Sequence, residues 1–207
     1  MSADKVDRTE VKKYFLLADA GKELFAQGPI FNRNELQEIY SDVLRAYNNL
    51  QEEELDEHIT DKVRLDRYNS MDWYRCDIAL GEMGPWPRMK GLPIEFTIGN
   101  IPETARMLDE CKKGNVSVLE ERMEIIRICV KKVRSIITNI DFVRPNFTLI
   151  LFPGGEIREK DYNVWARENG EPLCRIFRYD IDDGSERAVA YASSGLDKAP
   201  VYFGVRN

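Results

Sequence analysis

The sequence predicts an α+β fold, because helical and strand-like patterns occupy separate stretches of the chain instead of alternating. Apolar residues recur at helical spacing near the N-terminus, alternate with polar residues over 73–80, and form mostly strand-like runs in the C-terminal third. Such segregation is typical of a mixed or antiparallel sheet with separate helices. The chain has 207 residues and no long linker, so we expect a single domain over 1–207, in which residues 1–30 could form a docked N-terminal helical arm.

Two helices are predicted before the first strand. Residues 7–27 carry an apolar face, and Gly28 and Pro29 end that helix. Asn34 is a capping residue for a second helix over 34–54, whose apolar residues recur every three or four positions. These helices are expected to cover the sheet.

The middle of the chain mixes both patterns. Alternation predicts strands at 73–80 and 94–98, joined by a loop over 81–91 that is rich in proline and glycine. Capping sequences then open a helix over 100–114 and a long helix over about 118–140. The second of these has a broad apolar stripe, so we expect it to be the central core helix.

The C-terminal third is predicted to be β-rich. The run FTLILF at 147–152 is predicted to be a buried strand, and shorter strands are expected at 188–191 and 201–205, with a further strand at 173–179 if residues 169–170 form a hairpin turn. Residues 156–170 fit either a helix ending at a glycine or one arm of a hairpin with an Asn-Gly turn. Both alternatives stay open, although the aromatic and β-branched residues favour the hairpin.

Charge and cysteine content exclude several classes of protein. The chain has 36 acidic and 30 basic side chains, and a net charge of −6 does not fit a general nucleic-acid-binding protein. Its first residues are charged where a secretory signal would be apolar, and no apolar run reaches membrane length, so we expect a cytoplasmic, reducing location. The cysteines show no paired spacing typical of zinc sites. Of these, Cys111 lies beside two lysines and is expected to have a lowered pKa.

The sharpest candidate site combines Asp77 with Glu95 and Thr97. Metal-dependent nucleases hold Mg²⁺ or Mn²⁺ with carboxylates on adjacent strands, and alternation places Glu95 and Thr97 on one face of a predicted strand. The alternative is that all three side chains simply form the solvent face of two half-buried strands.

The order CDIAL, LPIEFTIG, helix and FTLILF over residues 34–152 resembles the core of the PD-(D/E)XK nucleases. The resemblance implies that Asp77 and Glu95 are metal ligands and that Glu38, on the preceding helix, is a further carboxylate. The chain departs from the family pattern at two positions. Cys76 stands in place of a proline, and Thr97 stands in place of the lysine that stabilises developing charge, so an inactive descendant of the fold is an alternative.

Aromatic and arginine residues point to a different function. Trp86 lies on a stiff loop and is either part of the core or an anchor for a partner protein. The candidate interface residues in the C-terminal third are Arg175, Phe177, Tyr179 and Tyr202. With a single histidine, His58, and no complete catalytic set, the chain is expected to be a non-catalytic interaction or assembly protein without a cofactor, binding another protein or itself as an oligomer. Mg²⁺-dependent nuclease activity on nucleic acid is the alternative, and no membrane partner is expected.

Overall fold

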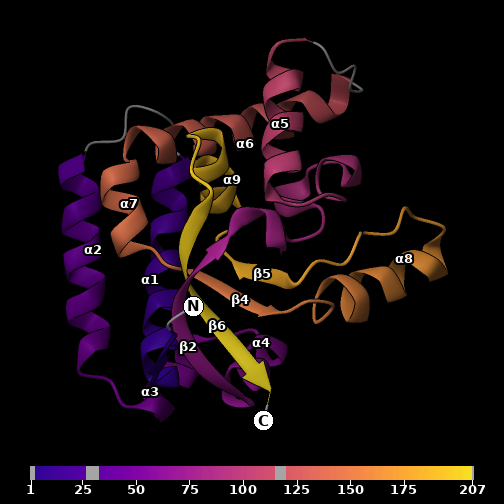
Figure 1. Cartoon of the computed structure of the whole chain (residues 1–207). Helices are drawn as coiled ribbons and strands as arrows, with labels where there is room; N and C mark the ends of the chain where they lie inside the picture. The colour runs from indigo at the N-terminus through magenta and orange to yellow at the C-terminus, as the bar shows by residue number, and fades with distance from the viewer. Residues whose placement is uncertain (1–2, 27–32, 115–119, 207) are drawn as a thin grey trace.

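The computed structural model describes residues 3–26, 33–114 and 120–206 (Figure 1). These residues form a mixed six-stranded sheet surrounded by helices, which confirms the α+β prediction. The strand order is β1-β2-β6-β4-β5-β3. The long strand β6 lies at the centre of the sheet, antiparallel to β2 and parallel to β4. Strand β4 is antiparallel to β5, and β5 pairs in parallel with the short edge strand β3.

The strands confirm three predicted segments, those at 73–80, 147–152 and 201–205. Their bounds are β1 Asp4–Val6, β2 Met71–Ala79, β3 Met83–Gly84, β4 Leu149–Pro153, β5 Tyr179–Asp183 and β6 Lys198–Arg206. The predicted β-rich character of the C-terminal third is only partly correct, because this part of the chain also contains α7, α8 and α9.

The helices lie on both sides of the sheet. Their bounds are α1 Arg8–Ala26, α2 Arg33–Asn48, α3 Glu52–His58, α4 Lys62–Asn69, α5 Ile101–Lys112, α6 Glu120–Thr138, α7 Ile140–Asn146, α8 Val164–Asn169 and α9 Ser185–Ser193. The predicted helix 34–54 is divided into α2 and α3, because Gln51 and Glu54 form a capping box that starts a new helix. The long helix expected at about 118–140 corresponds to α6, and residues 118 and 119 lie outside the described part.

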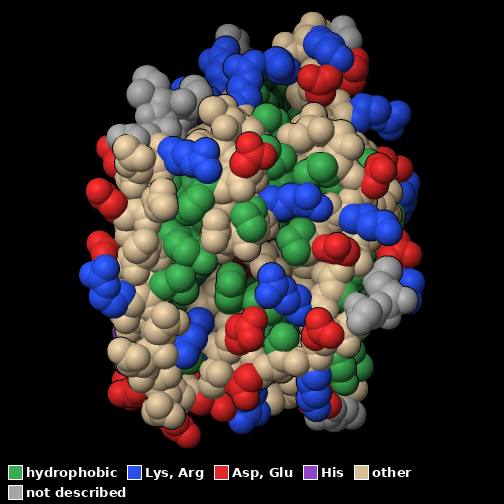
Figure 2. Space-filling view, turned by 60° about the vertical axis from the view of Figure 1, so that its left-hand side comes forward, with side chains coloured by type: hydrophobic (Ala, Val, Ile, Leu, Met, Phe, Trp, Pro, Cys, Tyr) green, Lys and Arg blue, Asp and Glu red, His purple; other side chains and the backbone are tan. Residues whose placement is uncertain are grey.

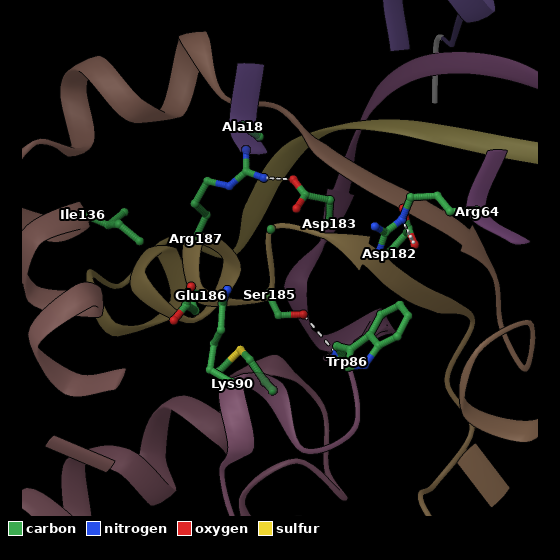
Figure 3. Close-up of a pocket in the computed structure, with 12 residues that line it drawn as sticks. Ala18, Arg64, Trp86, Lys90, Ile136, Asp182, Asp183, Ser185, Glu186 and Arg187 are labelled. Carbon is green, nitrogen blue, oxygen red and sulfur yellow. Dashed lines mark hydrogen bonds and ion pairs between the residues drawn. The ribbon is translucent and has the colours of Figure 1, made fainter. Parts of the chain in front are cut away.

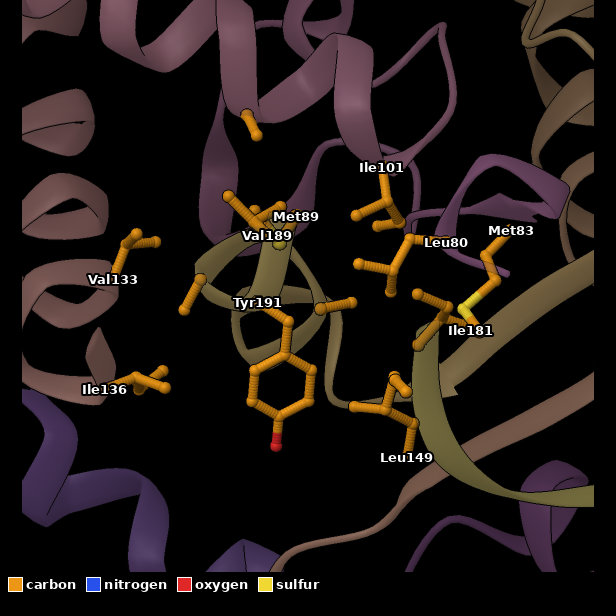
Figure 4. Packing of buried hydrophobic residues seen from close by; sticks show 14 of the residues in the cluster. Leu80, Met83, Met89, Ile101, Val133, Ile136, Leu149, Ile181, Val189 and Tyr191 are labelled. Atoms are coloured by element: carbon orange, nitrogen blue, oxygen red, sulfur yellow. The ribbon is translucent and has the colours of Figure 1, made fainter. Parts of the chain in front are cut away.

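Alternation along the strands creates a core on each face of the sheet. On one face, Trp73 and Phe152 pack with α1, α3 and α4. On the other face, Leu149 and Ile181 pack with α5, α6 and α9. Figure 4 shows this second core, in which Tyr191 of α9 lies among aliphatic side chains from several elements. The two faces explain why β4 is apolar along its whole length.

Three local predictions are wrong. Residues 94–98 are not a strand, because Ile94–Phe96 form a 3₁₀ turn that closes through hydrogen bonds to the carbonyls of Pro93 and Ile94. Residues 188–191 belong to helix α9, where all four side chains are buried and leave no alternation. The favoured hairpin is absent as well, and the helical alternative for this segment is correct: residues 158–169 are helical, and 171–177 belong to no strand.

The capping box of α5 supports a direct stability prediction. The Asn100 side chain accepts a hydrogen bond from the Glu103 N–H at 3.0 Å, and the Glu103 carboxylate accepts one from the Asn100 N–H at 2.9 Å. Asn100→Ala is expected to lower the free energy of unfolding by about 1 kcal/mol in urea titrations. Asn169→Ala is the control, because this amide contacts only a carbonyl in the last turn of α8. Equal losses in both variants would contradict the capping role.

Candidate functional site

The four carboxylate and hydroxyl residues of the nuclease hypothesis lie in unlike settings. Asp77 is exposed on β2 opposite Pro200 of β6, and Glu38 is exposed on α2. Glu95 is exposed on the 3₁₀ turn, so the strand that the resemblance requires for it is absent. Thr97 is buried, and its hydroxyl accepts a hydrogen bond from the Arg88 N–H at 2.9 Å. No group of three or more His, Cys, Asp or Glu within the described ranges is arranged to hold a metal.

Two of the predicted interface residues are part of the interior. Tyr179 packs edge-on against Phe203, and Tyr202 donates a hydrogen bond from its hydroxyl to Glu10 at 2.6 Å. Their burial removes both tyrosines from a binding surface. Sequence alternation could not distinguish an aromatic strand face covered by helices from one open to solvent.

Arg175 and Phe177 belong to a segment that we call the apolar lobe, residues 156–178. It comprises one π-helical turn over Arg158–Asn163, helix α8, and an extended return segment. Figure 1 shows α8 projecting away from the sheet. Hydrogen bonds between the Asn163 side chain and the Cys174 backbone hold the return segment beside the helical part.

The lobe exposes large hydrophobic side chains. Four such residues in the lobe have exposed fractions between 42% and 46%: Val164, Trp165, Leu173 and Ile176. Elsewhere in the described chain, large hydrophobic residues of this exposure are scattered on α4, α6 and β6. On the side of the molecule in Figure 2, hydrophobic side chains also reach the surface between charged ones. The hydrophobic side chains of α2 that pack against the core, such as Val43 and Leu44, are half-buried. The lobe is therefore the part of the fold where apolar surface is least covered.

A fully buried arginine attaches the lobe to the body of the protein. The Arg158 guanidinium donates hydrogen bonds to the carbonyls of Pro85 and Arg175, each at 2.7 Å, and to the carbonyl of Ile98. All of these acceptors are neutral, and burial lowers the pKa of Arg158. The buried Asp180 carboxylate also holds the start of the lobe, because it accepts hydrogen bonds from the backbone N–H groups of Gly155, Ile157 and Arg158.

A cleft of about 260 Å³ lies where β5 turns into α9. Figure 3 shows charged side chains of both signs around it. The cleft is lined by Ala18, Arg64, Trp86, Met89, Lys90, Ile136, Asp182, Asp183, Gly184, Ser185, Glu186 and Arg187. Gly184 makes the sharp turn possible, because its φ of +100° is in the left-handed region that favours glycine. Trp86 is half-buried at the edge of the cleft, and its backbone N–H donates a hydrogen bond to the Ser185 hydroxyl at 2.9 Å.

Two ion pairs neutralise most of the charge in this cleft. The Nε atom of Arg64 contacts both carboxylate oxygens of Asp182 at 3.0 and 2.9 Å, and the Tyr68 hydroxyl donates to the same carboxylate at 2.6 Å. Arg187 pairs with Asp183. Both guanidinium groups are thus held in place by carboxylates.

Lys90 and Glu186 are the charged side chains of the cleft that these pairs do not use. Within the described part of the chain, the Lys90 side chain makes neither a hydrogen bond nor an ion pair. Glu186 Oε1 is buried without a hydrogen-bond partner, and the nearest ammonium, that of Lys132, is 4.0 Å away. Burial raises the pKa of the Glu186 carboxyl. Lys90 and Arg88 both have φ of 52°, a strained value for residues with a side chain.

All four cysteines are free thiols, and Cys111, Cys129 and Cys174 are buried. Burial raises the pKa of Cys111, so the predicted lowering by its neighbouring lysines is wrong. Burial likewise raises the pKa of Cys129 to about 12.

Sequence reasoning missed both the cleft and the exposed residues of α8. Strand-like alternation at 188–191 hid the start of α9, although Gly184 followed by Ser185 and Glu186 is a typical helix N-terminal sequence. None of the described helices is long and apolar enough to span a membrane. Comparisons of the chain with protein-family models, with curated proteins and with solved structures give no match.

Proposed function

We propose that this protein is a non-catalytic assembly protein that associates with a second copy of itself through the apolar lobe. The observation that carries this proposal is the exposure of Trp165, Ile176 and their apolar neighbours on a projecting segment. Clustered apolar surface of this kind marks protein-contact sites in soluble proteins. Tryptophan at such a position is a frequent energetic anchor.

The charge of the lobe suits self-association. Residues 156–178 contain five acidic and five basic side chains, although the whole chain has a net charge of −6. Surface ion pairs such as Arg167–Glu159 and Arg175–Glu103 neutralise the charges around the apolar side chains. Two copies can therefore approach lobe to lobe without the repulsion that the rest of the acidic surface would produce.

The lobe is also held in a defined conformation. Arg158, Asp180 and Asn163 tie its helical turn to the return segment and to the sheet. A surface ordered in advance loses less conformational entropy on binding. This favours a specific interface over a loop that orders only on contact.

The test is the mass in solution, measured by light scattering and sedimentation. The wild-type protein is expected at a multiple of the chain mass of 24.0 kDa. Ile176→Ser is expected to weaken association by about tenfold, because it removes an apolar contact from the interface.

Ile128→Ser is the matched control, since Ile128 on α6 is the same residue type with a similar exposed fraction of 42%. It is expected to leave association unchanged. A wild-type protein that is monomeric at every accessible concentration would overturn the proposal, and so would equal effects of the two substitutions.

A further inference from the structure

A groove lies between helices α5 and α6, which both pack on α9 at one end of the molecule (Figure 1). Its first part is a hollow of about 140 Å³ between the two helices and the end of α9. A second hollow of about 440 Å³ continues from it along α5 and past the end of α9. Because the two hollows share Ala105, Asp109 and Ser193, they form one continuous surface feature, which we call the α5–α6 groove.

The floor of the α5–α6 groove is apolar. Leu108 of α5 and Val133 of α6 are buried at its base. Val130 and Ile137 of α6, and Leu196 after α9, are only partly buried against the core, so each keeps apolar surface open to the groove. A ligand with an apolar side of its own would remove this surface from water.

The rim of the groove carries cations that the rest of the described chain does not use. Arg106 and Lys112 of α5 and Arg134 of α6 line it and are exposed, and within the described ranges their side chains make no hydrogen bond or ion pair. Of the two acidic residues beside the groove, Asp109 is paired at 2.6 Å with a lysine of its own helix, and Asp197 lies in the second hollow, beyond the end of α9. Figure 2 shows several Lys and Arg side chains at this end of the molecule. The groove therefore presents three uncompensated cations against one carboxylate, in a chain whose net charge is −6.

We propose that the α5–α6 groove docks an acidic amphipathic helix of a partner protein. The apolar stripe of that helix covers Val130 and Ile137, and its carboxylates face Lys112 and Arg134 across the rim. Charge complementarity selects the partner, because an acidic segment is attracted to this rim and repelled by a surface that is acidic overall. A nucleic acid would satisfy the cations but would leave the apolar floor uncovered, since its backbone has no apolar stripe.

The walls of the groove favour a helical partner over an extended one. Helices α5 and α6 use their backbone N–H and C=O groups internally, so they offer no free strand edge. An extended segment would lose water from its own backbone groups and find no backbone partners in return. A helix satisfies its backbone itself and presents apolar side chains at intervals of three and four residues, which is the known way of filling such grooves.

The experiment is fluorescence anisotropy of the full chain with a labelled synthetic peptide of about 15 residues, a length at which isolated helices begin to form. The peptide carries leucine at intervals of three and four, with glutamate and alanine elsewhere, and its control has the same composition in shuffled order. The wild-type protein is expected to bind the patterned peptide at least about tenfold more tightly than the shuffled one, because only the patterned peptide places its leucines on one face. Added salt is expected to weaken this binding, because it screens the charges of the rim.

Two pairs of variants test the rim and the floor separately. Lys112→Glu is expected to weaken peptide binding by about tenfold, whereas Lys62→Glu, at an exposed lysine of α4, leaves it unchanged. Val130→Thr is expected to weaken it by about fivefold, because the hydroxyl that replaces a methyl group loses water under the peptide. Val63→Thr is its control, since Val63 is exposed on α4. These substitutions keep the size of the side chain or lie at exposed positions, so the variants are expected to fold, as circular dichroism would verify.

A labelled single-stranded oligonucleotide is the competing ligand. If it binds more tightly than the patterned peptide, and Lys112→Glu weakens it while Val130→Thr does not, the groove is a nucleic-acid site and the proposal is wrong. Absence of peptide binding, equal affinity for the patterned and shuffled peptides, or equal effects of Val130→Thr and Val63→Thr would also overturn it. Ile176→Ser in the apolar lobe is expected to retain peptide binding, so this result is separable from self-association.

Discussion

Replacing Arg158 with methionine is expected to lower the free energy of unfolding by about 3 kcal/mol or more, measured by chemical denaturation. The carbonyls of Pro85, Ile98 and Arg175 would lose their common donor, and the hydrogen bond to Pro85 is fully buried while the other two are partly buried. Each buried carbonyl left unpaired costs about 1–3 kcal/mol. Removing an isolated buried cation offsets part of this cost, which is why the expected loss is below the sum of the three.

Arg178→Met is the control for Arg158→Met, because Arg178 is mostly exposed and contacts Glu82 at 3.4 Å. Its expected loss is below about 1 kcal/mol. Gly84→Ala provides an independent check, since a Cβ atom at Gly84 would lie 2.7 Å from the Arg158 side chain and displace it. If Arg158→Met and Arg178→Met were equally stable, the proposed attachment of the lobe would be wrong.

Replacing Asp182 with alanine is expected to cost about 3–5 kcal/mol of folding free energy. This carboxylate is almost fully buried and accepts from both Arg64 and Tyr68. Its removal leaves a largely buried guanidinium and a buried hydroxyl without their acceptor. The measurement is the urea midpoint and slope, because loss of the ion pair should shift the midpoint without changing the surface exposed on unfolding.

Helix α4 supplies a matched control for this ion pair. Arg67, one turn after Arg64, pairs with Asp161 at 2.8 Å, and Asp161 is about half exposed. Asp161→Ala is expected to cost less than about 1 kcal/mol, because water replaces an exposed partner. Tyr68→Phe, which removes a single donor, is expected to fall between these two values. Similar losses for Asp182→Ala and Asp161→Ala would show that burial does not decide the strength of the pair.

Local patterns predicted the elements whose residues interact mainly with their chain neighbours. The capping box at Asn100 defined the start of α5, and the apolar stripe defined most of α6. The run FTLILF became β4 because each of its side chains is buried by one face of the sheet or the other. These predictions depended on hydrogen bonds and periodicity within a few residues.

Segments with two compatible patterns were decided by distant contacts. Residues 158–169 are helical because Asp180 and Asn163 satisfy backbone groups that a hairpin would pair differently. The alternation of apolar and polar residues at 94–98 predicted a strand, but these residues form a turn in which both Ile94 and Phe96 are buried. The metal site expected from Asp77 and Glu95 depended on that strand, so the error in the element carried over to the site.

The sequence by itself determined the α+β class, the central strands and the long helix, because these depend on periodicity, capping and apolar content along the chain. The tertiary structure decided which polar groups lost water. Arg158 and Asp182 look like ordinary surface residues in the sequence, and only packing from distant elements buries them. It also decided that Tyr202 is interior while Trp165 is exposed. Composition cannot distinguish these cases, because burial depends on what the remainder of the chain places over each side chain.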